Sequence, residues 1–218
     1  MKEGNLSKPF VAVESDKGFF FYFSTGLAFS LITDKIQSLK TKEDSTLKKG
    51  EIIIPPRYVE VDGSVIFLAG PIRGAIDWQG KAIHYIRNKN PELHIASPRR
   101  PILTQDEFQE ATFDEQVDWE HYYLQQAAEN GVTLFWLAKE AEHRCDRAYA
   151  QTTRFELGEA TGVHRFASIK VVVGIEDGFT GRKYIRKTLV KKYPNIPICD
   201  TLEQTCDLAI QLAKERKN

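Results

Sequence analysis

Apolar and polar positions follow a rhythm along this chain that predicts strands and helices in turn from residue 64 onward. Short apolar runs typical of buried strands occupy residues 64–69, 93–96, 132–137, 169–173 and 196–199. Segments with helical signals follow them, at residues 77–87, 113–128, around Glu156, 181–192 and 202–216. Apolar strands without clean alternation, separated by helices, predict an α/β fold with a parallel sheet covered on both faces.

The first sixty residues have a different texture. Two β-rich runs, residues 18–23 and 51–54, flank a polar stretch, and Pro55-Pro56 closes the unit. Residues 27–39 give a weak helix signal. We therefore expect a small β-containing appendage over residues 1–60, followed by an α/β domain over residues 61–218.

Charge and cysteine content exclude several classes of protein. Lys plus Arg and Asp plus Glu both number 30, so the global field does not favour duplex nucleic acid or an anionic membrane. A local basic patch remains open, around Arg99 and Arg100 or over residues 182–192. The three cysteines have no C-x-x-C spacing, the histidines are scattered, and no apolar run could span a bilayer. We expect a reduced, cytoplasmic protein with no membrane partner, metal or cofactor.

In a parallel sheet, ligands bind outside the carboxyl ends of the strands, and three segments are expected there. The first is the loop that contains Gly70, Pro71, Ile72, Arg73 and Gly74. Its glycines would let the backbone approach a ligand, but a tight turn alone would also need them. The second and third segments contain carboxylates on predicted helices, Asp118 with Glu120 and then Glu156. A glutamate on the buried side of a helix start is costly unless it is paired or used.

Aromatic side chains near these segments could stack on a ligand base. Trp78 and Phe155 fit core packing better, and for Tyr149 the two interpretations stay open.

Four motifs in order resemble one known family. They are Phe-Leu-Ala-Gly-Pro-Ile-Arg-Gly at 67–74, Val-Asp-Trp-Glu at 117–120 followed by Leu-Gln-Gln-Ala, a Leu-Phe-Trp strand, and Thr-Arg-Phe-Glu-Leu-Gly-Glu at 153–159. Over residues 64–178 the chain resembles the nucleoside 2-deoxyribosyltransferase-like superfamily, which includes deoxyribosyltransferases and deoxynucleotide N-glycosidases. The resemblance implies a flavodoxin-like (Rossmann-like) sheet and a small-molecule nucleoside or nucleotide as substrate. It also implies a homo-oligomer, because members commonly complete the site from a neighbouring subunit.

The resemblance also implies roles for individual residues. Glu156 matches the family's nucleophile, which forms a covalent glycosyl-enzyme. Glu120 matches the second acid, which protonates the departing base or holds sugar hydroxyls, and Asp118 is the fallback if the helix register differs. The remaining polar residues of the expected pocket are Arg147, Thr152 and Arg154.

Two departures from the family pattern put a 5′-phosphate pocket in doubt. Pro71 and Ala150 stand where members that act on 5′-monophosphates tend to have serines. Arg73, Arg147 and Arg154 could supply an alternative anion site. Transfer and hydrolysis both remain open, as do action on another N-glycoside such as a nicotinamide nucleotide and a non-catalytic nucleotide-sensing role.

Overall fold

The computed structural model describes residues 10–15, 18–23, 50–100, 110–143, 145–167 and 169–215. The chain divides into two compact units, residues 1–44 and 45–218. In the first unit, β1 (Phe10–Ser15) and β2 (Gly18–Phe23) pair in antiparallel register, as the β-rich run over 18–23 predicts. The helix expected over residues 27–39 lies outside the described residues.

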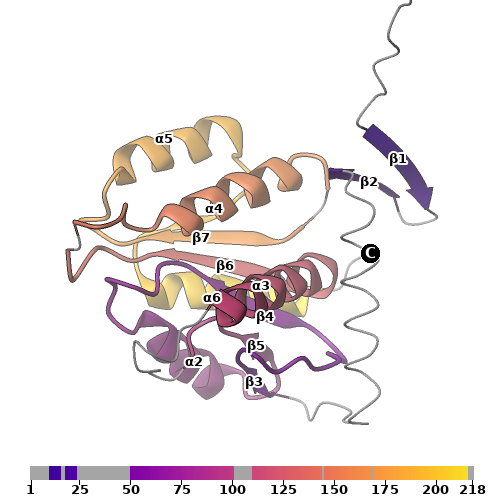
Figure 1. Cartoon of the computed structure of the whole chain (residues 1–218), viewed down its shortest axis with the longest axis horizontal. Helices are drawn as coiled ribbons and strands as arrows, with labels where there is room; N and C mark the ends of the chain where they lie inside the picture. The colour runs from indigo at the N-terminus through magenta and orange to yellow at the C-terminus, as the bar shows by residue number, and fades with distance from the viewer. Residues whose placement is uncertain are drawn as a thin grey trace, which may run out of the picture. The chain divides into compact units, whose positions relative to one another are not determined.

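The second unit is a six-stranded, all-parallel sheet flanked by helices (Figure 1). The strands are β3 (Ile52–Ile53), β4 (Val65–Ala69), β5 (His94–Ala96), β6 (Val132–Leu137), β7 (Val171–Ile175) and β8 (Ile198–Cys199), in the order β3-β5-β4-β6-β7-β8. The helices are α2 (Trp78–Lys89), α3 (Glu110–Asn130), α4 (Gln151–His164), α5 (Arg182–Lys192) and α6 (Leu202–Lys214). Apart from β3, this is the doubly wound order of flavodoxin-like folds, so the predicted fold class is confirmed.

One strand joins a different unit from the one its sequence suggests. Ile52 and Ile53 pair in parallel with Ile95 and Ala96 of β5, so β3 forms an edge of the main sheet. The sequence places this run with the appendage. Two paired residues carry too little pattern to show which sheet they join, and the fully buried Ile53 contributes to the core of the second unit.

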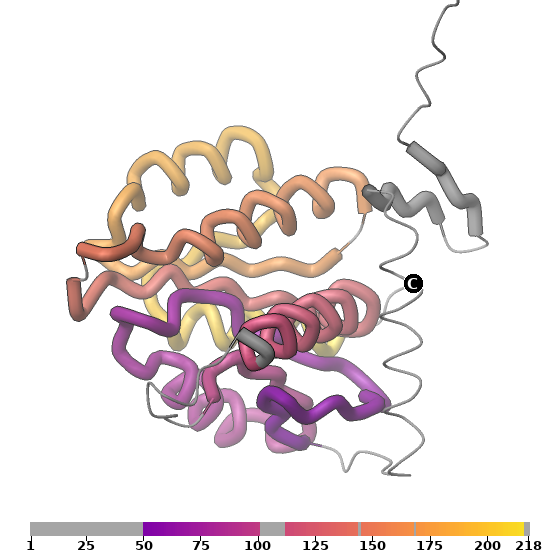
Figure 2. The backbone as a smooth tube through the Cα atoms, in the orientation of Figure 1, coloured from indigo at the N-terminus to yellow at the C-terminus, as the bar shows by residue number. Residues whose placement is uncertain are grey.

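Successive strand residues point to opposite faces of the sheet and build two cores. On one face, Phe67, Phe135 and Val173 pack with Trp119 and Tyr123 of α3, together with residues of α4 and α5. On the other face, a second cluster of strand residues packs against the apolar sides of α2 and α6. The tube in Figure 2 shows that the loops that follow β4 and β6 leave the sheet on the same side. Side chains from separate segments can therefore meet at this edge.

Candidate active site

The strand order reverses between β4 and β6, and the candidate loop of residues 70–74 follows the carboxyl end of β4. Gly70 follows β4 directly and is needed for packing. A Cβ at this position would lie 2.4 Å from Trp136 O and 2.6 Å from the Trp78 ring. The Trp78 indole is 1% exposed and donates to Pro71 O at 2.8 Å. Trp78 therefore supports the loop from inside the core, which leaves no open ring face for a base.

The same loop is fastened to the segment that follows β6. Gly74 has φ +80°, a conformation that glycine adopts most easily, and its carbonyl accepts from Ala141 N at 2.8 Å and Glu142 N at 3.1 Å. The Tyr149 hydroxyl donates to Ala138 O at 2.8 Å, so this tyrosine also holds the 138–142 stretch in place. The segment after β6 is thus tied to the β4 loop.

Glu156 lies in the second turn of α4 and is partly buried. Burial raises its pKa to about 7, and the negative charges of Glu120 and Glu159 act in the same direction. The structure therefore brings Glu156 of α4 and Glu120 of α3 close enough for their charges to repel. These two carboxyls are the pair that the sequence motifs select.

Glu120 is held by a chain of side chains on its own helix and on the segment after β5. Gln116 Nε2 donates to Glu120 Oε1 at 2.7 Å, and Arg100 Nε donates to Gln116 Oε1 at 2.7 Å. Burial raises the pKa of Glu120, while the Gln116 hydrogen bond and the charges of His121 and Arg100 lower it. Sequence reasoning missed Gln116, although its position four residues before Glu120 on a predicted helix was a readable signal.

Asp118 occupies a different side of α3. It lies about 200° of helix rotation from Glu120. With burial, its charge helps to raise the pKa of Tyr58 to about 12, and it is not among the groups that shift the pKa of Glu156. The geometry therefore favours Glu120 over Asp118 as the partner of Glu156.

The predicted pocket arginines and Thr152 differ in exposure and in contacts. Arg154 Nη2 donates to Thr180 O at 2.8 Å, and its guanidinium lies 4.6 Å from the Phe179 ring centroid. Arg147 is partly buried near Tyr149, whereas Arg73 and Thr152 are exposed. Arg154 is thus engaged by the loop before α5, and the charges of Arg154 and Arg147 both act on Tyr149, where they oppose the rise in its pKa that burial causes.

Two residues near Glu156 have unusual surroundings or backbone conformation. Phe155 was expected to pack in the core, but its side chain is 75% exposed. It falls on the solvent side of α4, between the inward positions taken by Thr153 and Leu157. Ala150 precedes α4 with φ +55°, a conformation rare for residues other than glycine, and makes no side-chain cap.

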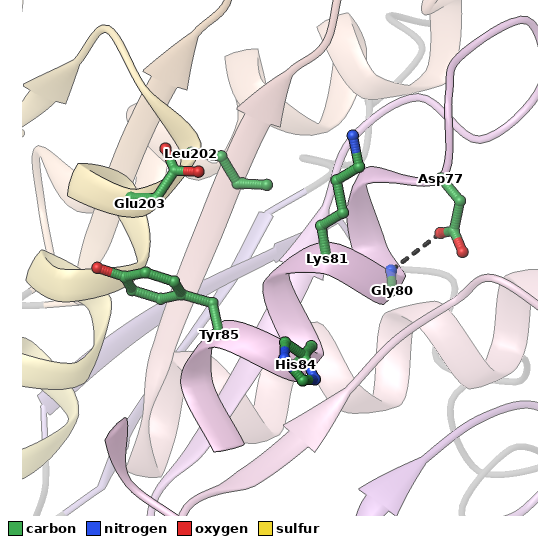
Figure 3. Close-up of a pocket in the computed structure, with 7 residues that line it drawn as sticks. All are labelled: Asp77, Gly80, Lys81, His84, Tyr85, Leu202 and Glu203. Atoms are coloured by element: carbon green, nitrogen blue, oxygen red, sulfur yellow. Dashed lines mark hydrogen bonds between the residues drawn. The ribbon is translucent and has the colours of Figure 1, made fainter. Parts of the chain in front are cut away.

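Two surface hollows lie away from the carboxyl pair. One, of about 500 Å³, lies between α2 and α6, where Tyr85 extends toward Leu202 and Glu203 (Figure 3). Another, of about 530 Å³, is lined by residues before β4 and at the ends of α3 and α6. Neither is lined by Glu120 or Glu156. Among the described residues, no group of three or more His, Cys, Asp or Glu could hold a metal ion, and no helix is long and apolar enough to cross a membrane.

Comparison with known proteins agrees with the motifs and the fold. Residues 63–179 match a family described as "Nucleoside 2-deoxyribosyltransferase like", which spans the β4 loop, α3 and α4. A search of curated proteins finds no match. The family match covers just over half of the 218 residues and includes both carboxyls of the pair. The chain belongs to the nucleoside 2-deoxyribosyltransferase-like family, which points to N-glycosidic bond chemistry on nucleosides.

Proposed function

We propose that this protein cleaves or transfers the N-glycosidic bond of a nucleoside through a covalent glycosyl intermediate on Glu156. The observation that supports this most directly is the electrostatic pairing of two partly buried carboxyls, Glu156 on α4 and Glu120 on α3. Two like charges in a partly dry site are unfavourable in the free protein. An electron-poor sugar carbon between them would relieve the repulsion, which fits stabilisation of an oxocarbenium-like transition state.

In the first step, the Glu156 carboxylate attacks the anomeric carbon. The C–N bond breaks, its electron pair leaves with the base, and the base takes up a proton. Glu120 either supplies that proton or accepts a hydrogen bond from a sugar hydroxyl. In the second step, water or a second base attacks the same carbon, breaks the ester bond to Glu156 and gives up a proton. The carboxylate is then regenerated.

A nucleoside fits the described residues better than a nucleoside 5′-monophosphate. Of the three arginines considered for a phosphate, Arg154 already bonds Thr180 O and stacks on Phe179. Ala150 and Pro71 offer no side-chain hydroxyl. Turnover of 2′-deoxyinosine should therefore exceed that of its 5′-monophosphate under matched conditions, and the reverse order would contradict the nucleoside assignment.

The decisive experiment replaces the nucleophile with its neutral isostere. Glu156→Gln should lower turnover of 2′-deoxyinosine by about 10³-fold or more, because a carboxamide is a poor nucleophile toward the sugar. Chromatography of reactions with and without added adenine would show base exchange for a transferase and free hypoxanthine for a hydrolase. Parallel reactions with a nicotinamide nucleotide would detect a different N-glycoside preference.

Glu159→Gln is the matched control for this substitution. Glu159 lies one turn further along α4, is exposed, and also raises the pKa of Glu156. This variant should keep activity within a few-fold of the parent protein. Full turnover by Glu156→Gln, or equal losses in the two variants, would refute Glu156 as the nucleophile. Tight nucleoside binding with no turnover by the parent protein would instead indicate a sensing role.

A further inference from the structure

Gln116 of α3 uses its whole side-chain amide in hydrogen bonds. Its Oε1 accepts from Arg100 Nε at 2.7 Å, and its Nε2 donates to Pro98 O at 2.9 Å and to Glu120 Oε1 at 2.7 Å. A flipped amide would set its NH₂ against the Arg100 donor and its carbonyl against two acceptors. The orientation of the amide is therefore fixed by its neighbours, and it presents a donor to Glu120.

Arg100 is fixed in turn. Its Nη2 donates to Glu115 Oε2 at 2.8 Å, and its side chain is only 14% exposed. Arg100 thus bridges two adjacent residues of α3, Glu115 and Gln116, from the segment that follows β5. In a partly buried position these charge-assisted bonds are stronger than the same bonds in water.

We propose that Gln116, oriented by Arg100, is a positioning residue that holds the Glu120 carboxylate in place beside Glu156. The proposal rests on the function proposed above, in which Glu120 is the second carboxyl of the site. Within the described residues, the bond from Gln116 engages only Oε1 of Glu120, so Oε2 remains for a substrate hydroxyl or the departing base.

The groups around Glu120 act on its charge in opposite directions. The Gln116 donor favours the carboxylate most, followed by the positive charges of His121 and Arg100. Burial opposes the charge. Without the amide donor, Glu120 would hold its proton to higher pH and would be free to change rotamer. Gln116 therefore fixes both the direction and the ionisation of this carboxyl.

The test compares two Gln-to-Met substitutions on the same helix. Gln116→Met removes the donor at similar length, and Gln125→Met removes a similar bond, from Gln125 Nε2 to Glu129 Oε1 at 2.9 Å on the exposed side of α3. Carbon-13 NMR of glutamate side-chain carboxyls would report each titration, with Glu120 assigned by its absence in Glu120→Gln. We expect Gln116→Met to raise the pKa of Glu120 by about one unit, and Gln125→Met to leave it unchanged.

Gln116→Glu provides a second variant if Gln116→Met folds poorly. It keeps an acceptor for Arg100 but places a negative charge against Glu120, so the pKa of Glu120 should rise further than in Gln116→Met. An unchanged Glu120 titration in a folded Gln116 variant would overturn the proposal. The NMR measurement needs no turnover, so a shifted titration supports the positioning role even if the parent protein proves inactive, a result that would count against the proposed function alone.

Activity supplies an independent readout. With 2′-deoxyinosine as substrate, kcat/KM should fall about 10-fold in Gln116→Met, the scale of one lost charge-assisted hydrogen bond. The pH profile should change shape as well, because the ionisation of Glu120 has moved. A uniform loss at every pH, matched by the loss in Gln125→Met, would indicate a general structural effect and overturn the positioning role.

Discussion

The two ends of α3 contain the same side-chain pair in opposite surroundings. Near the start, Gln116 donates to Glu120 at 2.7 Å, and near the end Gln125 donates to Glu129 at 2.9 Å, each across four residues. Gln125 and Glu129 are exposed to solvent. Glu120 is partly buried, and its Gln116 partner is backed by Arg100. Sequence spacing alone does not separate these two pairs.

The two pairs share residue types and spacing, so they differ only in their surroundings. An exposed i,i+4 pair contributes only ~0.2–0.5 kcal/mol to the helix and is screened by water. The buried pair lies opposite a second carboxyl, Glu156, and burial raises the pKa of both acids. Glu120 and Glu129, the acceptors of the inner pair (Gln116–Glu120) and the outer pair (Gln125–Glu129), should therefore respond differently to the same substitution.

The largest contrast should appear in turnover. Glu120→Gln should slow base release by about 10²-fold, the usual scale for loss of a general acid or a hydroxyl-binding carboxylate. Glu129→Gln removes the same charge from the exposed end of α3 and should leave turnover unchanged. Steady-state rates with 2′-deoxyinosine would be measured for both variants. Comparable losses in the two would contradict a specific role for Glu120.

A companion substitution tests the register of α3. Asp118→Asn should change turnover by less than a few-fold, since the charge of Asp118 acts on the pKa of Tyr58 and is not among the causes of the Glu156 shift. If Asp118→Asn gives the 10²-fold loss and Glu120→Gln does not, the assignment of the second carboxyl is wrong.

The next contrast is in pH dependence. A nucleophilic Glu156 must be ionised, and its pKa lies at about 7, so kcat/KM should rise about tenfold per pH unit up to that value. Glu120→Gln removes a like charge and should move the rising part of the pH–rate profile to lower pH. Glu129→Gln should leave the profile unchanged. Values of kcat/KM measured from pH 5 to 8.5 would give the pH at which the rise ends in each protein. A flat profile would exclude ionisation of Glu156 as the controlling step.

Much of the fold could be predicted from the sequence because buried strands appear as short, continuous apolar runs. The run over 132–137 matches β6 residue for residue, and every helix expected between 77 and 216 is present. The predicted ends of some elements were wrong by two or three residues, because the apolar pattern is weak there. Helix α3 begins at Glu110, three residues before the predicted start, and β7 runs two residues past the predicted end at Val173.

The candidate site was less readable because side-chain contacts depend on packing between distant segments. The motif order selected Glu156 and Glu120, and the charge of Glu120 helps to raise the pKa of Glu156. It could not show that Arg154 bonds Thr180 O, since that contact joins helix α4 to a loop 26 residues further along the chain. It also could not show that Phe155 is exposed, because aromatic residues occur in cores and at surfaces alike.

The smallest contrast is in stability. The pKa of Glu156 is raised from 4.5 to about 7 in the folded protein. Between these values the folded state keeps a proton that the unfolded chain has released, so this residue lowers stability as pH rises. The penalty is on the order of 3 kcal/mol above pH 7. Glu156→Gln removes it and should raise Tm by about 5–10 °C at pH 8 and by much less at pH 5.

Glu129→Gln is the matched substitution for this measurement as well. Because Glu129 is exposed, the difference in Tm between this variant and the parent protein should stay small and equal at the two pH values. Thermal unfolding of the parent protein, Glu156→Gln and Glu129→Gln at pH 5 and pH 8 would show whether only Glu156→Gln has a pH-dependent change in Tm. A pH-independent gain in Glu156→Gln would show that Glu156 is ionised in the free protein at an ordinary pKa. Its nucleophilic role would then not require the repulsive pairing with Glu120, and the inner and outer ends of α3 would differ in position alone.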